Sequence, residues 1–335
     1  MRPYLVRNTK PKLEIEPHTR SFKSSKRITP NRLSQDFYSM KNITVIGSGT
    51  MGNGIAHLFA QQGFAVSLVD LSPERLSMAL TTISKNMDRQ VTKGTLSESQ
   101  KMAALQRIQT HTDLAMAVDQ ADLVVEAATE NLEIKLELFR QLDQLAPATA
   151  VLASNTSSIS ITQIAAVTKR PAQVIGMHFM NPVPVMKLVE VIQGYATSAE
   201  TTSQIMQLAL QLDKVAVEVQ DYPGFVSNRI LMPMINEAIY TLYEGVAGVS
   251  EIDTVMKLGM AHPMGPLQLA DFIGLDVCLS ILSVLQEGFG NPKYAPCPLL
   301  KTMVAAGFKG VKTGEGFYCY PAGTKDFSVS SRFSK

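Results

Sequence analysis

A glycine-rich turn lies near the start of the regularly patterned part of this 335-residue chain. The apolar run from Ile43 to Ile46 leads into Gly47-Ser48-Gly49-Thr50-Met51-Gly52, and a segment of helical composition follows from about Asn53 to Gln62. In such a strand–turn–helix unit the first glycine permits a tight turn, the second admits a pyrophosphate to the backbone, and the third allows close helix packing. Gly47, Gly49 and Gly52 therefore predict a βαβ unit that binds a dinucleotide, although an ordinary βα turn is an alternative.

The next β-like run, AVSLVD, ends at Asp70, about 20 residues beyond the glycines. A carboxylate at this position accepts hydrogen bonds from the ribose hydroxyls and repels a 2′-phosphate. An aspartate at a strand end can instead cap a helix. Together with the glycine motif, Asp70 favours NAD over NADP, and the nearby Arg75 weakens that preference slightly.

Short apolar runs alternate with helix-compatible segments as far as about Tyr222. They are NITVIG, AVSLVD, ADLVVEA, AVLAS, QVIGMHF and KLVEVI. Short, nearly continuous apolar runs that alternate with helices are typical of a parallel sheet covered on both faces. We therefore predict a Rossmann-type α/β domain with a mostly parallel sheet over residues 40–222.

After Pro223 the β-like runs stop, and helical segments follow around residues 225–243, 250–258 and 277–286. Ser250 and Asp253 form a possible capping box for one of them. We predict an all-helical domain over residues 223–322, followed by a tail over 323–335.

The excess positive charge of the chain comes from residues 1–39. The formal net charge is +2, yet these residues contain nine Lys or Arg and three Asp or Glu, which leaves 22 basic and 26 acidic residues in the remainder. A nucleic-acid partner needs basic residues clustered on the folded surface. The predicted domains are mildly acidic, so we expect no such partner.

Residues 1–39 contain four prolines and no sustained apolar periodicity, which predicts a disordered extension. A mitochondrial transit peptide is one interpretation, but the acidic residues and prolines count against it. We favour a translation start at Met40.

The remaining composition is typical of an intracellular protein. No apolar run reaches the roughly 18 residues of a membrane-spanning helix, and the three cysteines form no C-x-x-C pair. We expect no membrane partner, no metal site and a cytoplasmic location, or the mitochondrial matrix if the extension is a transit peptide.

A histidine and a glutamate in neighbouring β-like runs are candidates for proton transfer. His178 lies at the end of the run from Val174 to Phe179, where ligands of α/β sheets bind. Glu190 interrupts the apolar run from Leu188 to Ile192, and a buried carboxylate is costly unless it is paired. If the two meet, Glu190 orients the imidazole and His178 accepts a proton from an alcohol. A satisfied core histidine is the alternative.

Seven segments between Met40 and Tyr320 resemble the L-3-hydroxyacyl-CoA dehydrogenase family, and most closely its bacterial 3-hydroxybutyryl-CoA dehydrogenases. They are IGSGTMGNGIA, VVEAATENLEIK, ASNTSSISIT, GMHFMNPVPVMKLVEVI, DYPGFVSNRI, GMAHPMGPLQLADFIGLD and KTGEGFYCY. The resemblance implies NAD-dependent oxidation of a short-chain (S)-3-hydroxyacyl-CoA to the 3-ketoacyl-CoA, and the reverse reduction. It also implies a homodimer joined through the C-terminal domain.

The resemblance further implies roles for single residues. His178 becomes the general base and Glu190 orients it, while Ser157 and Asn228 contact the reacting end of the substrate. The implied cofactor contacts are Gly47, Gly49, Met51, Gly52, Asp70, Glu130, Lys135, Ser157, Asn181 and Lys312. Without the resemblance, Glu130 and Lys135 could be a solvated helical charge pair.

A helical hairpin from about Ser72 to Leu105 corresponds to the CoA-binding insertion of the family. Lys93 resembles the lysine that meets the CoA phosphates, and Asn86 stands where a serine is expected. Three alternatives stay open: a 3-hydroxyadipyl-CoA dehydrogenase, a sugar-acid dehydrogenase of the same architecture, and a non-catalytic NAD-binding protein.

Overall fold

The structure is a computed structural model that describes residues 40–324 and 326–334. The predicted disordered extension and its transit-peptide alternative lie outside the described residues.

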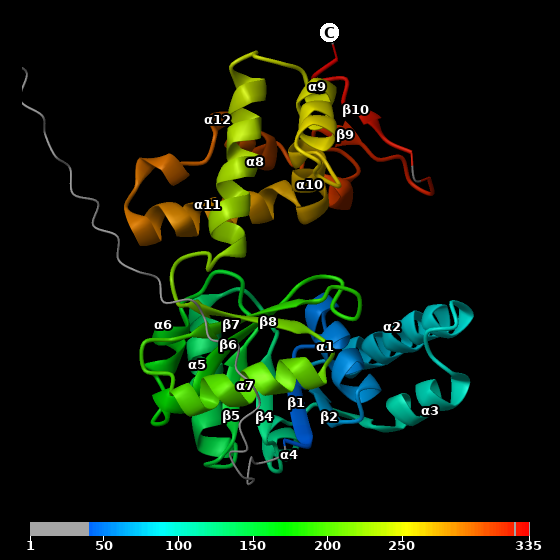
Figure 1. Ribbon diagram of the computed structural model, residues 1–335, viewed down its shortest axis with the longest axis vertical. Coiled ribbons are helices and arrows are strands. Elements are labelled where there is room, and N and C mark those ends of the chain that lie inside the picture. Colours follow the sequence, from blue (N-terminus) through cyan, green and yellow to red (C-terminus); the bar gives the residue numbers. More distant parts are fainter. Residues whose placement is uncertain (1–39, 325, 335) are drawn as a thin grey trace, which may run out of the picture. The chain divides into compact units, whose positions relative to one another are not determined.

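An eight-stranded sheet forms the centre of the N-terminal domain (Figure 1). Its order is β3-β2-β1-β4-β5-β6-β7-β8, and the neighbours are parallel except for the antiparallel pair β6 and β7. The strands are β1 (Asn42–Ile46), β2 (Ala65–Val69), β3 (Ile108–His111), β4 (Leu123–Glu126), β5 (Val151–Ser154), β6 (Val174–Phe179), β7 (Leu188–Gln193) and β8 (Val215–Gln220). The prediction of a mostly parallel sheet is confirmed, while β3 and β8 were not predicted.

Helices cover both faces of this sheet, as expected. They are α1 (Thr50–Gln61), α2 (Pro73–Thr92), α3 (Glu98–Gln106), α4 (Leu114–Val118), α5 (Leu132–Leu145), α6 (Ile161–Ala165) and α7 (Ala199–Gln211), with a 3₁₀ turn at Pro171–Gln173 before β6. Neighbouring residues of one strand join different apolar clusters: Val45 packs with α1 and α7, and Ile46 packs with α5 and α6. This follows from the two-residue period of a strand, which directs successive side chains to opposite faces.

The predicted hairpin is formed by α2 and α3, drawn in cyan in Figure 1. Ser72 caps α2 by accepting a hydrogen bond from the backbone of Arg75. Ser97 and Gln100 form a capping box at the start of α3. Buried Ile83 and Met87 attach α2 to the core that α1 also lines.

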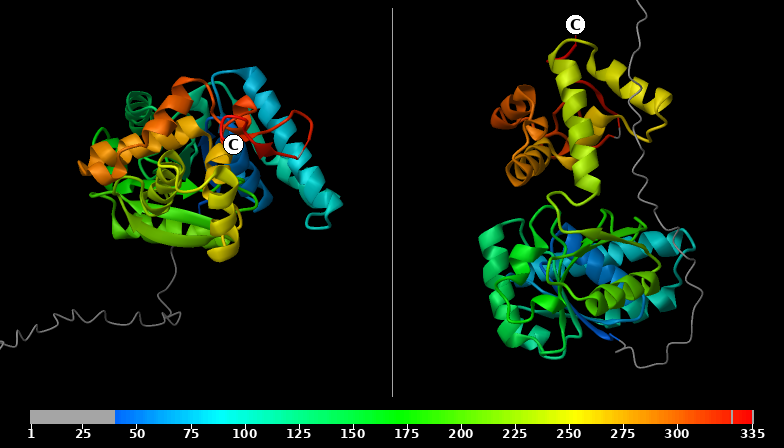
Figure 2. Two further views of the ribbon diagram at one scale, coloured as in Figure 1. Left: turned by 90° about the horizontal axis from the view of Figure 1, so that it is seen from above. Right: turned by 60° about the vertical axis from the view of Figure 1, so that its left-hand side comes forward.

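The C-terminal domain is mainly helical and has an apolar core of its own, and Figure 2 shows it from two further directions. Its elements are α8 (Ser227–Tyr243), α9 (Val249–Thr254), a π-helical turn (Val255–Gly259), α10 (Pro266–Ile273), α11 (Leu275–Phe289), α12 (Pro298–Ala305), and 3₁₀ turns at Pro292–Tyr294 and Val311–Thr313. Two short strands, β9 (Tyr318–Cys319) and β10 (Ser328–Val329), pair antiparallel. The domain is therefore not purely helical, and the predicted tail supplies one of its strands. Strands of two residues are too short to show a period in the sequence.

The predicted capping box of Ser250 and Asp253 is wrong. Helix α9 follows Gly248 and has no side-chain cap. Asp253 is buried and accepts hydrogen bonds from the backbones of Leu267 and Gln268 and from the hydroxyl of Tyr318. This carboxylate therefore holds the start of α10 rather than the start of its own helix.

Within the described residues, no single helix has both the length and the apolar composition of a membrane span. Helices α10 and α11 pass that test only as a pair, which is bent by 96°.

Candidate active site

His178 and Glu190 meet because β6 and β7 run antiparallel. The two residues are directly opposite each other in the strand register, and Nδ1 of His178 lies 2.8 Å from Oε2 of Glu190. Directly opposed side chains of antiparallel strands are close neighbours. Both are buried, with exposed fractions of 8% and 2%. Because the carboxylate can only accept, Nδ1 donates and Nε2 is left as the ring nitrogen that can accept a proton.

The start of α8 supplies the other partners of Glu190. The backbone N–H groups of Val226 and Ser227 donate to Oε1, and the Ser227 hydroxyl donates to Oε2 at 2.8 Å. Burial opposes ionisation of Glu190, but the hydrogen bonds from His178 and Ser227 outweigh it and hold the pKa of this carboxyl below its ordinary value. A helix N-terminus also favours a negative charge. Glu190 thus stays ionised at neutral pH, beside the histidine.

A cavity of about 430 Å³ opens beside His178. Seven of the predicted site residues line it: Met51, Glu130, Lys135, Ser157, His178, Asn181 and Asn228. The side-chain amide of Asn228, on α8, donates to the backbone carbonyl of Ser157 at 3.0 Å. The loop after β5 and the first turn of α8 therefore meet at the cavity, as required if Ser157 and Asn228 act on one ligand.

The glycine motif has the space that a dinucleotide needs. Gly47 has φ +95° and an added Cβ would lie 2.7 Å from the Ala127 carbonyl, while a Cβ on Gly52 would lie 1.7 Å from the Gly47 carbonyl. A Cβ on Gly49 would meet nothing within 4 Å. The outer glycines are thus required by the turn and the helix, and Gly49 leaves open space at the N-terminus of α1, where an anion is favoured.

Asp70 lies beside this turn and has an oxygen to spare. Its Oδ2 accepts the backbone N–H and the hydroxyl of Ser48 at 2.9 and 2.7 Å, whereas Oδ1 receives only the backbone of Ser72, at 3.4 Å. Burial opposes ionisation, but these hydrogen bonds and Arg75 together lower the pKa of the carboxyl. A charged Asp70 with a largely free Oδ1 fits the ribose hydroxyls of NAD.

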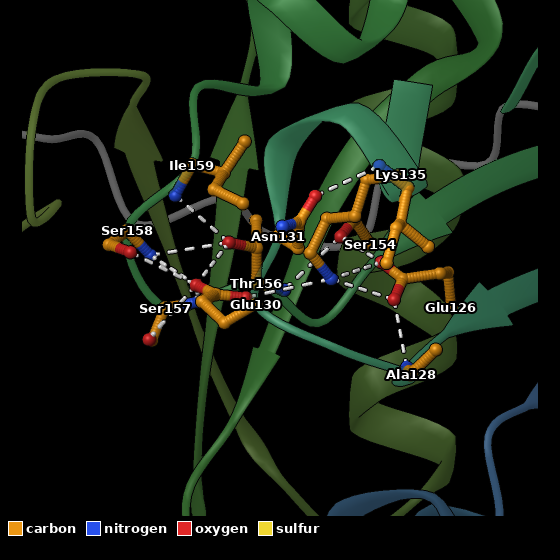
Figure 3. A network of polar contacts seen from close by, with 11 residues as sticks. Glu126, Ala128, Glu130, Asn131, Lys135, Ser154, Thr156, Ser157, Ser158 and Ile159 are labelled. Atoms are coloured by element: carbon orange, nitrogen blue, oxygen red, sulfur yellow. Dashed lines mark hydrogen bonds and ion pairs between the residues drawn. The ribbon is translucent and has the colours of Figure 1, made fainter. Parts of the chain in front are cut away.

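Lys135 lies in a network of carboxylates at the end of β4, which Figure 3 shows. Its ammonium is 2.7 Å from both carboxylate oxygens of Glu126 and 3.5 Å from Oε2 of Glu130. The exposed fractions are 3% for Lys135, 0% for Glu126 and 39% for Glu130. The alternative of a solvated helical charge pair is therefore wrong, because the lysine is buried and its first partner is Glu126.

Glu130 connects this network to the loop after β5. Its Oε1 accepts the hydroxyls of Thr156 and Ser158 and the backbone N–H groups of Ser157 and Ser158 at 2.6 to 3.1 Å. Burial opposes ionisation of Glu130, but Lys135 and these donors lower its pKa. The charged form of Glu130 thus orders the loop that carries Ser157.

Among the other predicted residues, three lie outside both the cavity lining and the contacts described above: Asn86, Lys93 and Lys312. Asn86 and Lys93 lie on the outer part of the hairpin, where the Asn86 amide oxygen accepts from Arg89 and Lys93 is exposed at the end of α2. Lys312 lies in the 3₁₀ turn after α12 and forms an ion pair with Asp276.

Four residues that contribute to the site were not predicted: Glu126, Ser154, Asn155 and Ser227. The Asn155 side chain accepts the backbone N–H of Phe179 at 2.9 Å and lines the cavity. A signal existed for Glu126, because an acidic residue ends an otherwise apolar run, much as Glu190 interrupts one. Asn155 and Ser227 gave no comparable signal, since Ser and Asn are common at turns and helix starts.

Two family models match the two domains of the chain. The sequence model for "3-hydroxyacyl-CoA dehydrogenase, NAD binding domain" matches residues 42–222, and the model for the C-terminal domain of the same family matches residues 224–320.

Similar proteins include bacterial and animal enzymes. The probable 3-hydroxybutyryl-CoA dehydrogenase of Bacillus subtilis is 56% identical over 281 residues, covering 84% of this chain and 98% of that protein. The human mitochondrial hydroxyacyl-coenzyme A dehydrogenase is 44% identical over 288 residues, covering 84% and 91%. The crystal structure of (S)-3-hydroxybutyryl-CoA dehydrogenase from Ralstonia eutropha matches with a TM-score of 0.82 at 48% identity, covering 84% of this chain and all of that one.

Proposed function

The chain belongs to the 3-hydroxyacyl-CoA dehydrogenase family, and we propose that its substrates are short-chain (S)-3-hydroxyacyl-CoA thioesters such as 3-hydroxybutyryl-CoA. Membership makes it an NAD-dependent oxidoreductase of fatty-acid metabolism that acts on acyl-CoA. The names of the bacterial relatives support the short chain length and a role in butyrate metabolism. The observation that carries the proposal is the His178–Glu190 pair at a cavity that Glu130, Lys135 and Asn181 also line.

In the oxidative direction, His178 removes the proton of the 3-hydroxyl group. Nε2 is the accepting atom, because Nδ1 is held by Glu190 as a donor. The negative charge of Glu190 then stabilises the imidazolium. When bound, NAD supplies the acceptor for the hydride that leaves C3. In the reductive direction the same nitrogen returns its proton to the forming alcohol.

Ser157 and Asn228 bind the reacting end of the substrate. Both line the cavity beside His178, and the hydrogen bond from Asn228 to the Ser157 carbonyl holds them together. Polar side chains at this position orient the 3-hydroxyl toward Nε2.

The cofactor site extends from the glycine turn to the cavity. Gly47, Gly49 and Gly52 with the start of α1 receive the pyrophosphate, and Asp70 receives the adenosine ribose. The residues assigned to the nicotinamide half are Met51, Glu130, Lys135, Ser157, Asn181 and Lys312. The cavity lining supports all of these except Lys312, for which the support is the family resemblance alone.

We assign CoA binding to the α2–α3 hairpin and divide the described chain accordingly. The NAD-binding domain with its hairpin covers residues 40–222, and the C-terminal domain begins at residue 223 and includes β10, which lies beyond the predicted bound of 322. The exposed ammonium of Lys93 supports a contact with CoA phosphates, and the Asn86 side chain lies on the same helix.

The C-terminal domain forms a homodimer in this proposal. Val226, just before α8, and Ile230, on α8, expose 48% and 67% of their surface beside a cavity of about 1030 Å³ that Phe225, Tyr240 and Tyr294 also line. Exposed apolar side chains that lie together can mark a protein interface. Sizing chromatography at working concentration should give twice the chain mass, and a monomer would contradict this assignment.

The bacterial relatives support a cytoplasmic location.

The direct test of the proposed function is NADH oxidation in the presence of acetoacetyl-CoA. We expect rapid loss of NADH absorbance, slower turnover with NADPH, and a decline of kcat/KM along a series of longer 3-ketoacyl-CoA thioesters. A preference for the 3-ketoadipyl thioester would identify the dicarboxylic substrate instead. Activity with free hydroxy acids and none with CoA thioesters would refute the proposal.

A further inference from the structure

We propose that Glu126 is a positioning residue for the cofactor site, which acts by holding the ammonium of Lys135. Glu126 ends β4 and has no exposed surface, so it does not itself reach the cavity. The inference rests on the proposed contact between Lys135 and the nicotinamide half of NAD.

Each oxygen of Glu126 has a defined set of partners. Oε1 accepts the backbone N–H of Ala128 at 2.8 Å, Oε2 accepts the hydroxyl of Ser154 at 2.6 Å, and both accept from Lys135 at 2.7 Å (Figure 3). Ala128 and Ser154 belong to the loop after β4 and to the neighbouring strand β5. The carboxylate is thus fixed by the sheet, and it fixes the lysine in turn.

The position of Lys135 has a consequence beyond its own contact. Its ammonium approaches Oε2 of Glu130, while Oε1 of Glu130 accepts donors from the loop that carries Ser157. A chain of contacts therefore runs from Glu126 through Lys135 and Glu130 to Ser157, and from there to Asn228. Displacing the ammonium disturbs both the cofactor contact and this loop.

The substitution Glu126→Gln weakens one link of this chain and leaves the others in place. Its amide oxygen takes the Oε1 position, because Ala128 offers only a donor. The NH₂ group then faces the Ser154 hydroxyl, which can accept as well as donate, and the Lys135 ammonium, which can only donate. Glu126→Gln therefore removes the negative charge and the Oε2 contact with Lys135, and it leaves the ammonium only a neutral oxygen at the Oε1 position.

Asp143 provides a matched control. Its carboxylate lies on α5, the helix that also carries Lys135. It is largely buried and pairs with Arg170 at 3.0 Å, and it does not line the cavity. Neutralising either carboxylate leaves a largely buried cation without its charged partner, so both variants are expected to lower the melting temperature.

The measurement is a fluorescence titration with NADH in the absence of acyl-CoA, with melting curves to establish that each variant is folded. We expect Glu126→Gln to raise the Kd for NADH about tenfold, because the Lys135 ammonium has lost its charged partner, while Asp143→Asn leaves that Kd within about twofold of wild type. In steady state, Glu126→Gln should raise the KM for NADH by a larger factor than it lowers kcat. An unchanged Kd in Glu126→Gln, or an equal rise in both variants, overturns the proposal.

A double-mutant cycle with Lys135→Met tests the route of the effect. If Glu126 acts through the lysine, Glu126→Gln adds no further loss of NADH affinity once Lys135 is methionine. Additive losses overturn the proposal. If Glu126→Gln does not fold, Glu126→Asp takes its place, since its carboxylate is withdrawn by one methylene; wild-type NADH affinity in that variant overturns the proposal.

The proposed substrate and the role of Glu126 are tested separately. Wild-type protein that binds NADH but does not reduce acetoacetyl-CoA refutes the proposed substrate, and the ratios of the Kd values for NADH still test Glu126.

Discussion

Replacing Glu190 with glutamine should place the imidazole proton of His178 on Nε2. This is the nitrogen that has to accept the proton of the substrate. The two oxygens of Glu190 have different partners: Oε1 accepts backbone N–H groups of Val226 and Ser227, and Oε2 accepts from His178 Nδ1 and the Ser227 hydroxyl. Backbone N–H groups cannot accept, so the glutamine oxygen must take the Oε1 position. Its NH₂ group then faces Nδ1, which has to accept, and the imidazole proton moves to Nε2.

The size of the effect follows from the loss of a general base. Proton transfer by a positioned side chain contributes about 10² to 10⁴-fold to turnover, so kcat of Glu190→Gln should fall by a factor in that range. The effect on stability is smaller, since the backbone contacts survive and the lost charge at the start of α8 is worth about 1 kcal/mol. NADH affinity should change little, because Glu190 is not among the residues that line the cavity.

The assay is kcat and kcat/KM for the oxidation of (S)-3-hydroxybutyryl-CoA by NAD between pH 5 and 9, because His178 is the general base in that direction, with NADH binding measured in parallel. Ser227→Ala is the matched control, because it removes one neutral donor to Oε2 and leaves the carboxylate; it should lower kcat by no more than about fivefold. If Glu190→Gln keeps more than about a third of the wild-type kcat across this range, the tautomer reasoning is wrong.

Three further predictions follow from the site and its support. His178→Ala should lower kcat by about 10² to 10⁴-fold while the Kd for NADH stays near wild type, and an unaltered rate would remove the proposed mechanism. Asp70→Ala should weaken NADH binding by roughly tenfold and reduce the preference over NADPH, because hydrogen bonds to a carboxylate are lost and its repulsion of a 2′-phosphate disappears. Burial lowers the pKa of His57 on α1. Below about pH 6.5, His57 is protonated in the unfolded chain but resists protonation in the native state, so the free energy of unfolding should decrease as the pH falls through that value. Urea denaturation at pH 7 and 5 should show this decrease, and His57→Gln should make the decrease smaller.

The prediction of the fold succeeded where the signal was local. A strand, three glycines, a helix and an acidic residue at the end of the next strand lie within 28 residues, from Ile43 to Asp70. The steric or electrostatic reason for each of these features can be read from the residues next to it in the chain. Strand β3 is short and mostly polar, so its pairing with the sheet decides that it is a strand. Strand β8 carries valines at alternate positions, which is a strand pattern that the prediction missed, although most of its positions are exposed.

The same distinction between local signals and tertiary contacts holds for the candidate site. The composition and order of the chain were enough to single out His178 and Glu190, because a histidine at a strand end and a carboxylate in an apolar run are each unusual by themselves. Their contact depends on the antiparallel register of β6 and β7, and the charge on Glu190 depends on the arrival of α8. In the same way, the sequence shows that Glu126 ends an apolar run, but only the folded sheet brings its carboxylate to the ammonium of Lys135. A short-range pattern reports which groups are chemically able to act, whereas distances between groups far apart in the chain arise from packing that no local segment contains.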